Sequence, residues 1–180
     1  MYGPVIEGST FRLRPLRPAE AEVMVAWFED QVVTRFLKLR NPPSLQSELE
    51  WMNRIAGDPN VIQWAIEHEG RLVGTTGINQ ISWANQHGST GTLIGDRSAW
   101  GKGIAREMMR ARADYAFTQH PFSKLKSGYL DGNEASRRAQ AAAGYREVGR
   151  LHREFFREGR WIDMIVTELL REDWERRGAG

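Results

Sequence analysis

Two glycines one residue apart, Gly101 and Gly103, stand between a short apolar run and the start of a helical pattern. Glycine lets the backbone approach an anion closely and adopt angles that are closed to other residues. The free N–H groups and the positive dipole end of a helix that starts directly afterwards would point at the same anion. The pattern favours a phosphate-binding loop that fits pyrophosphate. An isolated pair of this kind is also typical of an ordinary strand-to-helix turn.

Two better-known phosphate loops do not fit the spacing. A dinucleotide fingerprint needs Gly or Ala three places after the second glycine, where this chain has Arg106. A P-loop needs Gly-Lys followed by Ser or Thr, and here Lys102 lies between the two glycines. The loop therefore indicates neither NAD nor ATP.

The composition is that of one globular domain. A chain of 180 residues, 41% hydrophobic and 27% charged, is long enough to bury a core without disulfides. No apolar run approaches the ~20 residues of a membrane-spanning helix. The N-terminus lacks the basic and apolar regions of a signal peptide. We expect a soluble, cytoplasmic protein with no membrane partner.

Cysteine, histidine and charge exclude several further classes. The absence of cysteine excludes disulfides, thiolate metal sites and a cysteine nucleophile. The four histidines are isolated and match no metal-binding spacing, so we expect no metal. Basic residues exceed acidic ones by only 25 to 23, so the pI near 9.1 reflects no large positive field. Nucleic-acid binding is not expected.

The remaining pattern predicts a mixed α/β domain. The helix that follows the glycine loop has apolar positions at helical spacing, with Arg106, Glu107, Arg110 and Arg112 largely on its opposite face. The predicted element order is β-α-α-β-β-β-α-β-α-β-β. Strands are expected over residues 10–16, around a turn at 69–70, over 90–96, 124–130, 145–157 and 160–170, and helices from 18, 44–56, 103–119 and 133–143, before a charged tail with Trp174.

Two motifs in this order carry a family resemblance. In the first motif Trp100 is followed by Gly103 and Ala105. In the second, Asn133 and Ser136 precede a Gly-Tyr pair at 144–145. On these residues the chain resembles the GNAT superfamily of N-acetyltransferases, in the branch with ribosomal-protein alanine acetyltransferases and spermidine acetyltransferases; at the position of Trp100 that superfamily usually has Arg or Gln. The resemblance implies one N-acetyltransferase domain over residues 9–175, with a single mixed sheet of six to seven strands flanked by helices.

The resemblance also implies how the acetyl donor, acetyl-CoA, would bind without a metal. Its pyrophosphate would sit on the loop, and its pantetheine arm would enter between the strand ending at 94–96 and the strand over 124–130, as an added strand does. Lys102 could add charge, or be a plain exposed lysine. The implied cofactor-binding residues are Ile94, Gly95, Asp96, Gly101, Lys102, Gly103, Ile104, Ala105, Arg106, Asn133 and Ser136.

Amide formation from a thioester needs a neutral amine, a stabilised oxyanion and a proton for the leaving thiolate. A backbone N–H near Gly95 could hold the oxyanion. The resemblance assigns the thiolate's proton to Ser136, although Asn133 and Ser136 could instead be a plain N-cap and a first-turn serine. The position of a tyrosine acid in many relatives is Gln140 here. Tyr145 is expected to pack in the core.

A general base is harder to assign. One glutamate position of the family falls on Phe155, and Glu154, our candidate catalytic carboxylate, would point to the opposite sheet face unless a bulge intervenes. The other usual carboxylate position is Thr90. A weak base suits an α-amine, which has a pKa of about 7.7 to 8.0, better than an alkylamine with a pKa of about 10.4.

We therefore expect transfer to a primary amine by direct attack, with a peptide or protein N-terminus favoured as acceptor. Phe36, Trp83, Phe155 and Trp161 are the expected substrate residues. Residues 153–163 also resemble the matching segment of polyamine enzymes, so a polyamine or other small amine is the alternative. Two further alternatives are a non-catalytic acetyl-CoA-binding module and a nucleic-acid-binding domain. The expected partners are an amine-bearing small molecule or peptide and a second copy of the chain in a homodimer.

Overall fold

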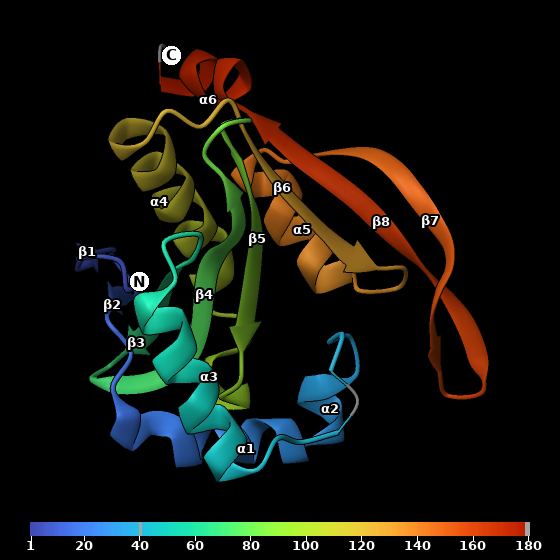
Figure 1. Cartoon of the computed structure of the whole chain (residues 1–180). Coiled ribbons are helices and arrows are strands. Elements are labelled where there is room, and N and C mark those ends of the chain that lie inside the picture. The colour runs from blue at the N-terminus through green and yellow to red at the C-terminus, as the bar shows by residue number, and fades with distance from the viewer. Residues whose placement is uncertain (40, 179–180) are drawn as a thin grey trace.

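The computed structural model describes residues 1–39 and 41–178 as one open sheet with helices on both faces (Figure 1). The strands, in chain order, are β1 (Ile6–Glu7), β2 (Arg12–Arg14), β3 (Ile62–His68), β4 (Arg71–Ser82), β5 (His87–Ile94), β6 (Lys124–Leu130), β7 (Arg146–Arg157) and β8 (Arg160–Leu170). The helices are α1 (Ala21–Glu29), α2 (Gln31–Thr34), α3 (Leu45–Gly57), α4 (Ile104–Gln119), α5 (Glu134–Ala143) and α6 (Arg171–Gly178), with short 3-10 turns at Pro18–Glu20 and Arg97–Ala99.

The predicted mixed α/β architecture is confirmed, but the count of six to seven strands is wrong because the sheet has eight. The additional strand is β1, which pairs with β2 over only two residues and is too short to show periodicity. The predicted charged tail forms α6. There Trp174 packs against Phe117 and donates from Nε1 to the Asp114 carboxylate at 2.6 Å.

The order of strands places a junction at the middle of the sheet. The order is β1-β2-β3-β4-β5-β6-β8-β7, and β5 and β6 are the parallel neighbours. They pair over only three residue pairs, from His87–Lys124 to Ser89–Lys126. Beyond that point β5 continues beside β4 and β6 continues beside β8, so the two strands separate.

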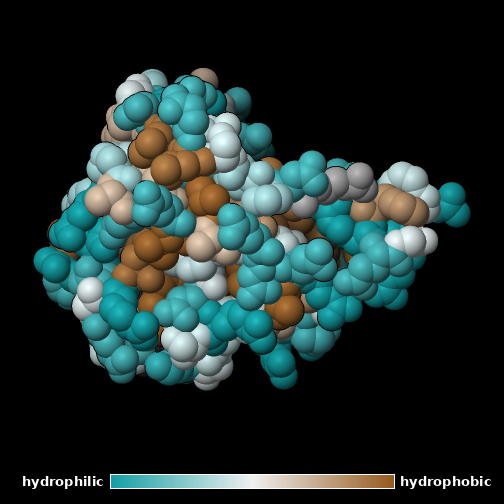
Figure 2. Space-filling model, turned by 90° about the horizontal axis from the view of Figure 1, so that it is seen from below, coloured by the Kyte–Doolittle hydropathy of each residue, from teal (hydrophilic) through white to brown (hydrophobic). Residues whose placement is uncertain are grey.

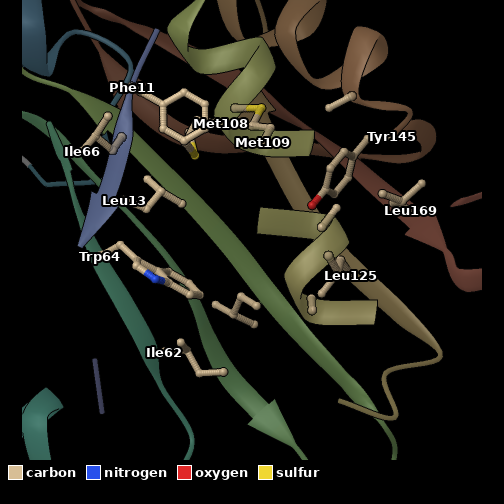
Figure 3. Close-up of a cluster of buried hydrophobic side chains, with 14 of the residues drawn as sticks. Phe11, Leu13, Ile62, Trp64, Ile66, Met108, Met109, Leu125, Tyr145 and Leu169 are labelled. Carbon is tan, nitrogen blue, oxygen red and sulfur yellow. The ribbon is translucent and has the colours of Figure 1, made fainter. Parts of the chain in front are cut away.

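Buried side chains fill both faces of the sheet. On one face α4 packs over alternating residues of the N-terminal strands, and Figure 3 shows Met108 and Met109 with Leu13, Trp64 and Ile66. On the other face α1 and α3 pack in a second cluster. Helices on both faces hold β5 and the start of β6 in place.

One residue of α4 departs from the predicted helix pattern. The helix pattern predicts Arg112 on the outer face, but its side chain is only 1% exposed. It lies in the row of Met109 and Ala116, three residues before and four residues after it, which faces the sheet. From α4 the long side chain reaches polar groups of β4 and β5.

The β7–β8 hairpin projects away from the rest of the molecule (Figure 1). Seen from below, its surface is mostly hydrophilic (Figure 2). β7 is an edge strand that is exposed along most of its length. In the described part of the chain, no helix combines the length and the apolar character that crossing a membrane requires.

Candidate functional site

The glycine loop has the backbone geometry of an anion site. Gly101 and Gly103 have φ of +76° and +80°, in the left-handed region that favours glycine, and Gly103 is the N-cap of α4. The first turn of the helix is closed by a bond from the Glu107 N–H to the Gly103 carbonyl at 3.2 Å. The N–H groups of residues 104–106 therefore have no partner within the helix and point out of its N-terminus.

The side chains of the loop divide between core and solvent. Ile104 is 1% exposed, so only its backbone can meet a ligand. Lys102 and Arg106 are exposed, and the Lys102 Nζ lies 3.5 Å from the His68 ring. Hydrogen bonds from Ser98 hold the pKa of Asp96 below its ordinary value. Its carboxylate caps the turn before the loop, so Asp96 shapes the loop.

The gap between β5 and β6 exposes backbone groups. The Gly95 N–H donates to the Val73 carbonyl at 2.9 Å, and the antiparallel register then directs residues 93 and 91 to β4 as well. Thr92 and Ile94 alternate with these residues and direct their polar groups into the gap. The Ile94 carbonyl accepts a bond from Trp100 Nε1 at 2.9 Å, which leaves the Ile94 N–H and both groups of Thr92 facing the gap.

This register decides which N–H is available for an oxyanion. Gly95 itself is already bonded to Val73, so the free donors nearest to it are those of Ile94 and Thr92. Gly95 is glycine for a different reason. A Cβ there would lie 2.0 Å from the ring of Trp27, which packs α1 against the end of β5.

The second motif lies at the other side of the gap, at the start of α5. Asn133 Oδ1 accepts a bond from the Ser136 N–H at 3.1 Å, so Asn133 is the N-cap. Ser136 is half-buried, and its Oγ accepts a bond from Gln140 Nε2 at 3.0 Å. Gln140 is buried and was not among the predicted site residues.

A buried polar cluster lies beneath the point where the strands separate. Arg112 Nη1 donates to the Gly91 carbonyl at 2.9 Å and to Thr92 Oγ1 at 3.0 Å. Tyr145 is 5% exposed, which confirms that it packs in the core, and its hydroxyl lies 3.2 Å from Thr90 Oγ1. These contacts fix the residues of β5 that directly follow its last pair with β6, Ser89–Lys126. The spacing of Arg112 from Met109 and Ala116 could have revealed its burial.

Strand β7 contains a bulge at residues 152–154. Between the pairs Leu151–Met164 and Phe155–Ile162, β7 advances four residues while β8 advances two. Arg153 has φ of +55°, and its N–H donates to the Asp163 carboxylate at 2.9 Å. That bond and those from Arg150 and His152 lower the pKa of Asp163 to about 2.

The bulge is the feature that Glu154 required in order to leave the regular alternation of the strand. Glu154 is exposed, and within the described residues its carboxylate has no hydrogen-bond or ion-pair partner. Phe155 is half-buried beyond the bulge, with the Arg157 guanidinium 5.6 Å from its ring. The bulge therefore separates an unpaired carboxylate from a partly covered aromatic ring.

The tip of the hairpin meets the segment after α2. Arg157 Nη2 donates to the carbonyls of Leu37 and Lys38 at 2.9 and 3.1 Å, and Arg35 pairs with Glu158 at 3.3 Å. A depression of about 400 Å³ lies between the two segments. It is lined by Gln31, Thr34, Arg35, Leu39, Asn41, Phe156, Arg157 and Glu158.

Three of the four expected substrate residues stand on the two segments that border the depression, but none of them is among the residues that line it. Phe36 stands on the segment that the hairpin contacts, and Phe155 and Trp161 stand on the hairpin, where the Trp161 ring meets Phe156. Trp83 is not brought to them. It stacks on Phe122 at 5.6 Å beside the start of β5, the end opposite Ile94. In the parts of the chain that the structure describes, no group of acidic and histidine side chains could hold a metal ion.

Comparison with known proteins gives the same assignment as these two motifs. A family model described as acetyltransferase (GNAT) domain matches residues 10–146. The chain is 26% identical over 171 residues to a putative ribosomal N-acetyltransferase, YdaF, of Bacillus subtilis, covering 91% of this chain and 92% of that protein.

Two solved structures share the fold. One is the spermidine N-acetyltransferase of Vibrio cholerae in complex with CoA and spermine, with a TM-score of 0.86, 21% identity and coverage of 93% and 99% of the two chains. The other is RimL, a ribosomal L7/L12 alpha-N-protein acetyltransferase in complex with coenzyme A, with a TM-score of 0.83, 14% identity and coverage of 93% and 98%. With the family model covering both the glycine loop and the second motif, the chain belongs to the GNAT acetyltransferase family and is an acetyl-CoA-dependent N-acetyltransferase.

Proposed function

We propose that this protein acetylates a low-pKa primary amine, a peptide or protein N-terminal α-amine, by direct attack on the thioester of acetyl-CoA. The observation that supports acetyl-CoA as the donor is the gap between β5 and β6, because it offers unpaired backbone groups beside the anion loop. The observation that favours an α-amine is the identity of the residues at the two usual carboxylate positions, Thr90 and Phe155.

The donor would lie along β5. The pyrophosphate would accept bonds from the N–H groups of residues 101–106, and Lys102 and Arg106 would add positive charge. The pantetheine amides would pair with Thr92 and Ile94 as an added strand does. Asp96 and Asn133 would shape the loop and the start of α5 on either side.

The chemistry then has three requirements that this chain's groups can meet. The amine nitrogen forms a bond to the thioester carbon, the carbonyl oxygen is held by whichever N–H of Thr92 and Ile94 the pantetheine leaves unpaired, and the carbon–sulfur bond breaks. The nitrogen loses one proton, to Glu154 or to water. The leaving sulfur gains one from the hydroxyl of Ser136, which regains a proton from solvent.

The depression between the hairpin tip and the segment after α2, which we assign as the acceptor mouth, argues against a polyamine. Arg35 and Arg157 stand beside the depression together with Glu158, and that carboxylate is already paired with Arg35. A polycation would meet unfavourable charge there. The observation that favours a polyamine acceptor is the fold shared with a spermidine N-acetyltransferase, so a polyamine is the second candidate.

The test is a panel of acceptors, with release of free CoA thiol as the measurement. We expect turnover with short peptides bearing a free α-amine, and weaker turnover with spermidine or with peptides whose only amine is a lysine side chain. Faster turnover with spermidine would reverse the order of the two candidates. Tight acetyl-CoA binding with no thiol release under any amine would instead identify a non-catalytic binding module. The nucleic-acid-binding alternative is tested by measuring binding at increasing ionic strength, because binding to nucleic acid would weaken steeply with salt.

Ser136 has its own test. Ser136→Ala is expected to lower kcat by ~10- to 100-fold with little change in acetyl-CoA affinity, because the variant lacks the proton donor for the leaving thiolate. Ser47→Ala is the matched control for loss of a hydroxyl, because Ser47 holds the same first-turn position in α3, with its N–H bonded to the N-cap Ser44 at 3.1 Å. An unchanged kcat for Ser136→Ala would make Ser136 a structural first-turn residue.

A further inference from the structure

Gln140 stands one helical turn beyond Ser136 on α5, and its amide makes three hydrogen bonds. Its side chain is 3% exposed. Nε2 donates to Ser136 Oγ at 3.0 Å and to the Gly128 carbonyl at 3.2 Å. Oε1 accepts from Thr167 Oγ1 at 2.6 Å. The amide thus joins α5 to β6 and β8.

These contacts fix the orientation of the amide. A backbone carbonyl can only accept, so the Gln140 atom that faces Gly128 must be the nitrogen. The oxygen then faces Thr167, whose hydroxyl donates. Both hydrogens of the amide nitrogen are engaged, and neither end can be exchanged without leaving a buried group unpaired.

The orientation of Gln140 sets the orientation of the Ser136 hydroxyl. Because Ser136 Oγ accepts from Gln140, its own hydrogen must point elsewhere. Within the described residues this hydrogen has no acceptor. A serine in a helix often donates to the carbonyl one turn back, but no such bond forms here. The hydrogen is therefore free for an acceptor outside the protein.

The same amide holds the edge of β6. Gly128 pairs with Val166 of β8. The Asp131 N–H donates to the Asp163 carbonyl at 3.0 Å, so by alternation the backbone groups of Gly128 face the gap. Thr167, which anchors the amide from β8, is 2% exposed. Ser136 and the strand edge beside the gap are thus held by one buried group.

We infer that Gln140 is the positioning residue that makes Ser136 a hydrogen donor to the leaving sulfur. This inference rests on the proposed role of Ser136. In the position where the resemblance places a tyrosine acid, this chain has an amide that orients the serine. Gln140 itself touches neither substrate, and it acts through Ser136.

The test is a double-mutant cycle in the intact protein, with acetyl-CoA and the best acceptor of the panel. Gln140→Met keeps the side-chain volume and removes the donor, and we expect kcat to fall by ~10-fold while KM for acetyl-CoA stays within about twofold. In a Ser136→Ala background the same change should cost less than about twofold, because its target is already absent. Gln63→Met, at another buried glutamine, controls for general loss of a buried amide.

Gln140→Glu gives a second readout that does not depend on the first variant folding well. An ionised carboxylate would accept the hydrogen of Ser136, whereas a protonated one can donate as the amide does. The kcat of the variant relative to wild type should therefore rise as the pH is lowered. Equal losses for Gln140→Met in both backgrounds would overturn the inference and leave Gln140 a structural residue. Full activity of Ser136→Ala would overturn the proposed role of the serine instead.

Discussion

Gly91 lies on β5 and Gly95 directly follows that strand, but their surroundings differ. A Cβ at Gly91 would meet no atom within 4 Å, while one at Gly95 would lie 2.0 Å from the Trp27 ring. The sequence shows both only as glycines near the end of a strand. The tryptophan that decides their difference comes from a distant helix.

We predict that Gly95→Ala lowers the free energy of unfolding by about 1–3 kcal/mol, because Trp27 must move to make room. Gly91→Ala is the matched control and should change it by less than about 0.5 kcal/mol. Chemical denaturation of both variants measures the difference. Equal stabilities would show that Trp27 does not press on this end of β5.

Glu48 gives a pH-dependent prediction. Its side chain is 6% exposed in the first half of α3, and burial raises its pKa. A raised folded-state pKa means that its stabilising contribution is complete below the unfolded pKa of about 4.3 and is lost as the pH rises through the folded pKa. Glu48→Gln should therefore raise Tm at pH 7 and increase the free energy of unfolding by up to about 1 kcal/mol. Both gains should shrink toward pH 4.

The control for this prediction is Glu50→Gln, on the exposed side of the same helix. It should leave the pH dependence of Tm unchanged. A Glu48→Gln variant with the same Tm as wild type at every pH would show that Glu48 finds solvent or a partner in the folded protein.

At the scale of elements, regular patterns were predictable and local interruptions were not. The helix after the glycine loop and the final hairpin follow from periodicity in the sequence. The bulge at Arg153 does not, because it depends on Asp163 of the neighbouring strand. Gln140 is hidden for the same reason, since its partners Gly128 and Thr167 belong to two other strands.

We predict that Asp163→Ala relaxes the bulge, because the Arg153 N–H loses its acceptor. Amide hydrogen exchange at Arg153 should become several-fold faster, and KM for the acceptor should rise while KM for acetyl-CoA stays constant. Asp131→Ala is the control, since Asp131 shares Arg150 with Asp163 but holds no backbone group of the bulge.

The pH dependence of the bulge follows from the same carboxylate. The pKa of Asp163 is lowered to about 2, so its contribution is complete above about pH 4 and is lost as the pH falls through 2. Fast exchange at Arg153 in wild type at pH 5 would contradict this assignment.

At the scale of the whole molecule, the sheet is continuous only through three residue pairs between β5 and β6. A ligand that pairs with Thr92 and Ile94 would extend that junction. The sequence predicted the two motifs on either side of it. The short length of the junction depends on where β6 turns to follow β8, which is a property of the assembled sheet.

CoA at 100 times its Kd is expected to stabilise the protein by about 2.7 kcal/mol, which corresponds to a rise in Tm of roughly 5–10 °C at this chain length. Amide exchange at Thr92 and Ile94 should slow in parallel. Thermal unfolding and exchange measure the two effects.

Gly103→Glu should abolish both effects, through blockage of the loop and repulsion of the pyrophosphate. Gly70→Glu is the matched control, because Gly70 also has a positive φ, +75°, at a turn far from the loop in sequence. Unchanged CoA affinity in Gly103→Glu would place the pyrophosphate elsewhere.

The projecting hairpin has a consequence for how such a protein can change. The outer part of the hairpin, residues 150–165, is continuous in sequence, and its two ends lie side by side as the Arg150–Ile165 pair. It contains none of the residues proposed to hold CoA. One contiguous exchange of coding sequence would therefore replace a wall of the acceptor mouth and leave the donor half intact. New acceptors could be acquired in this way by recombination within a single gene segment, without a new route for the acetyl group.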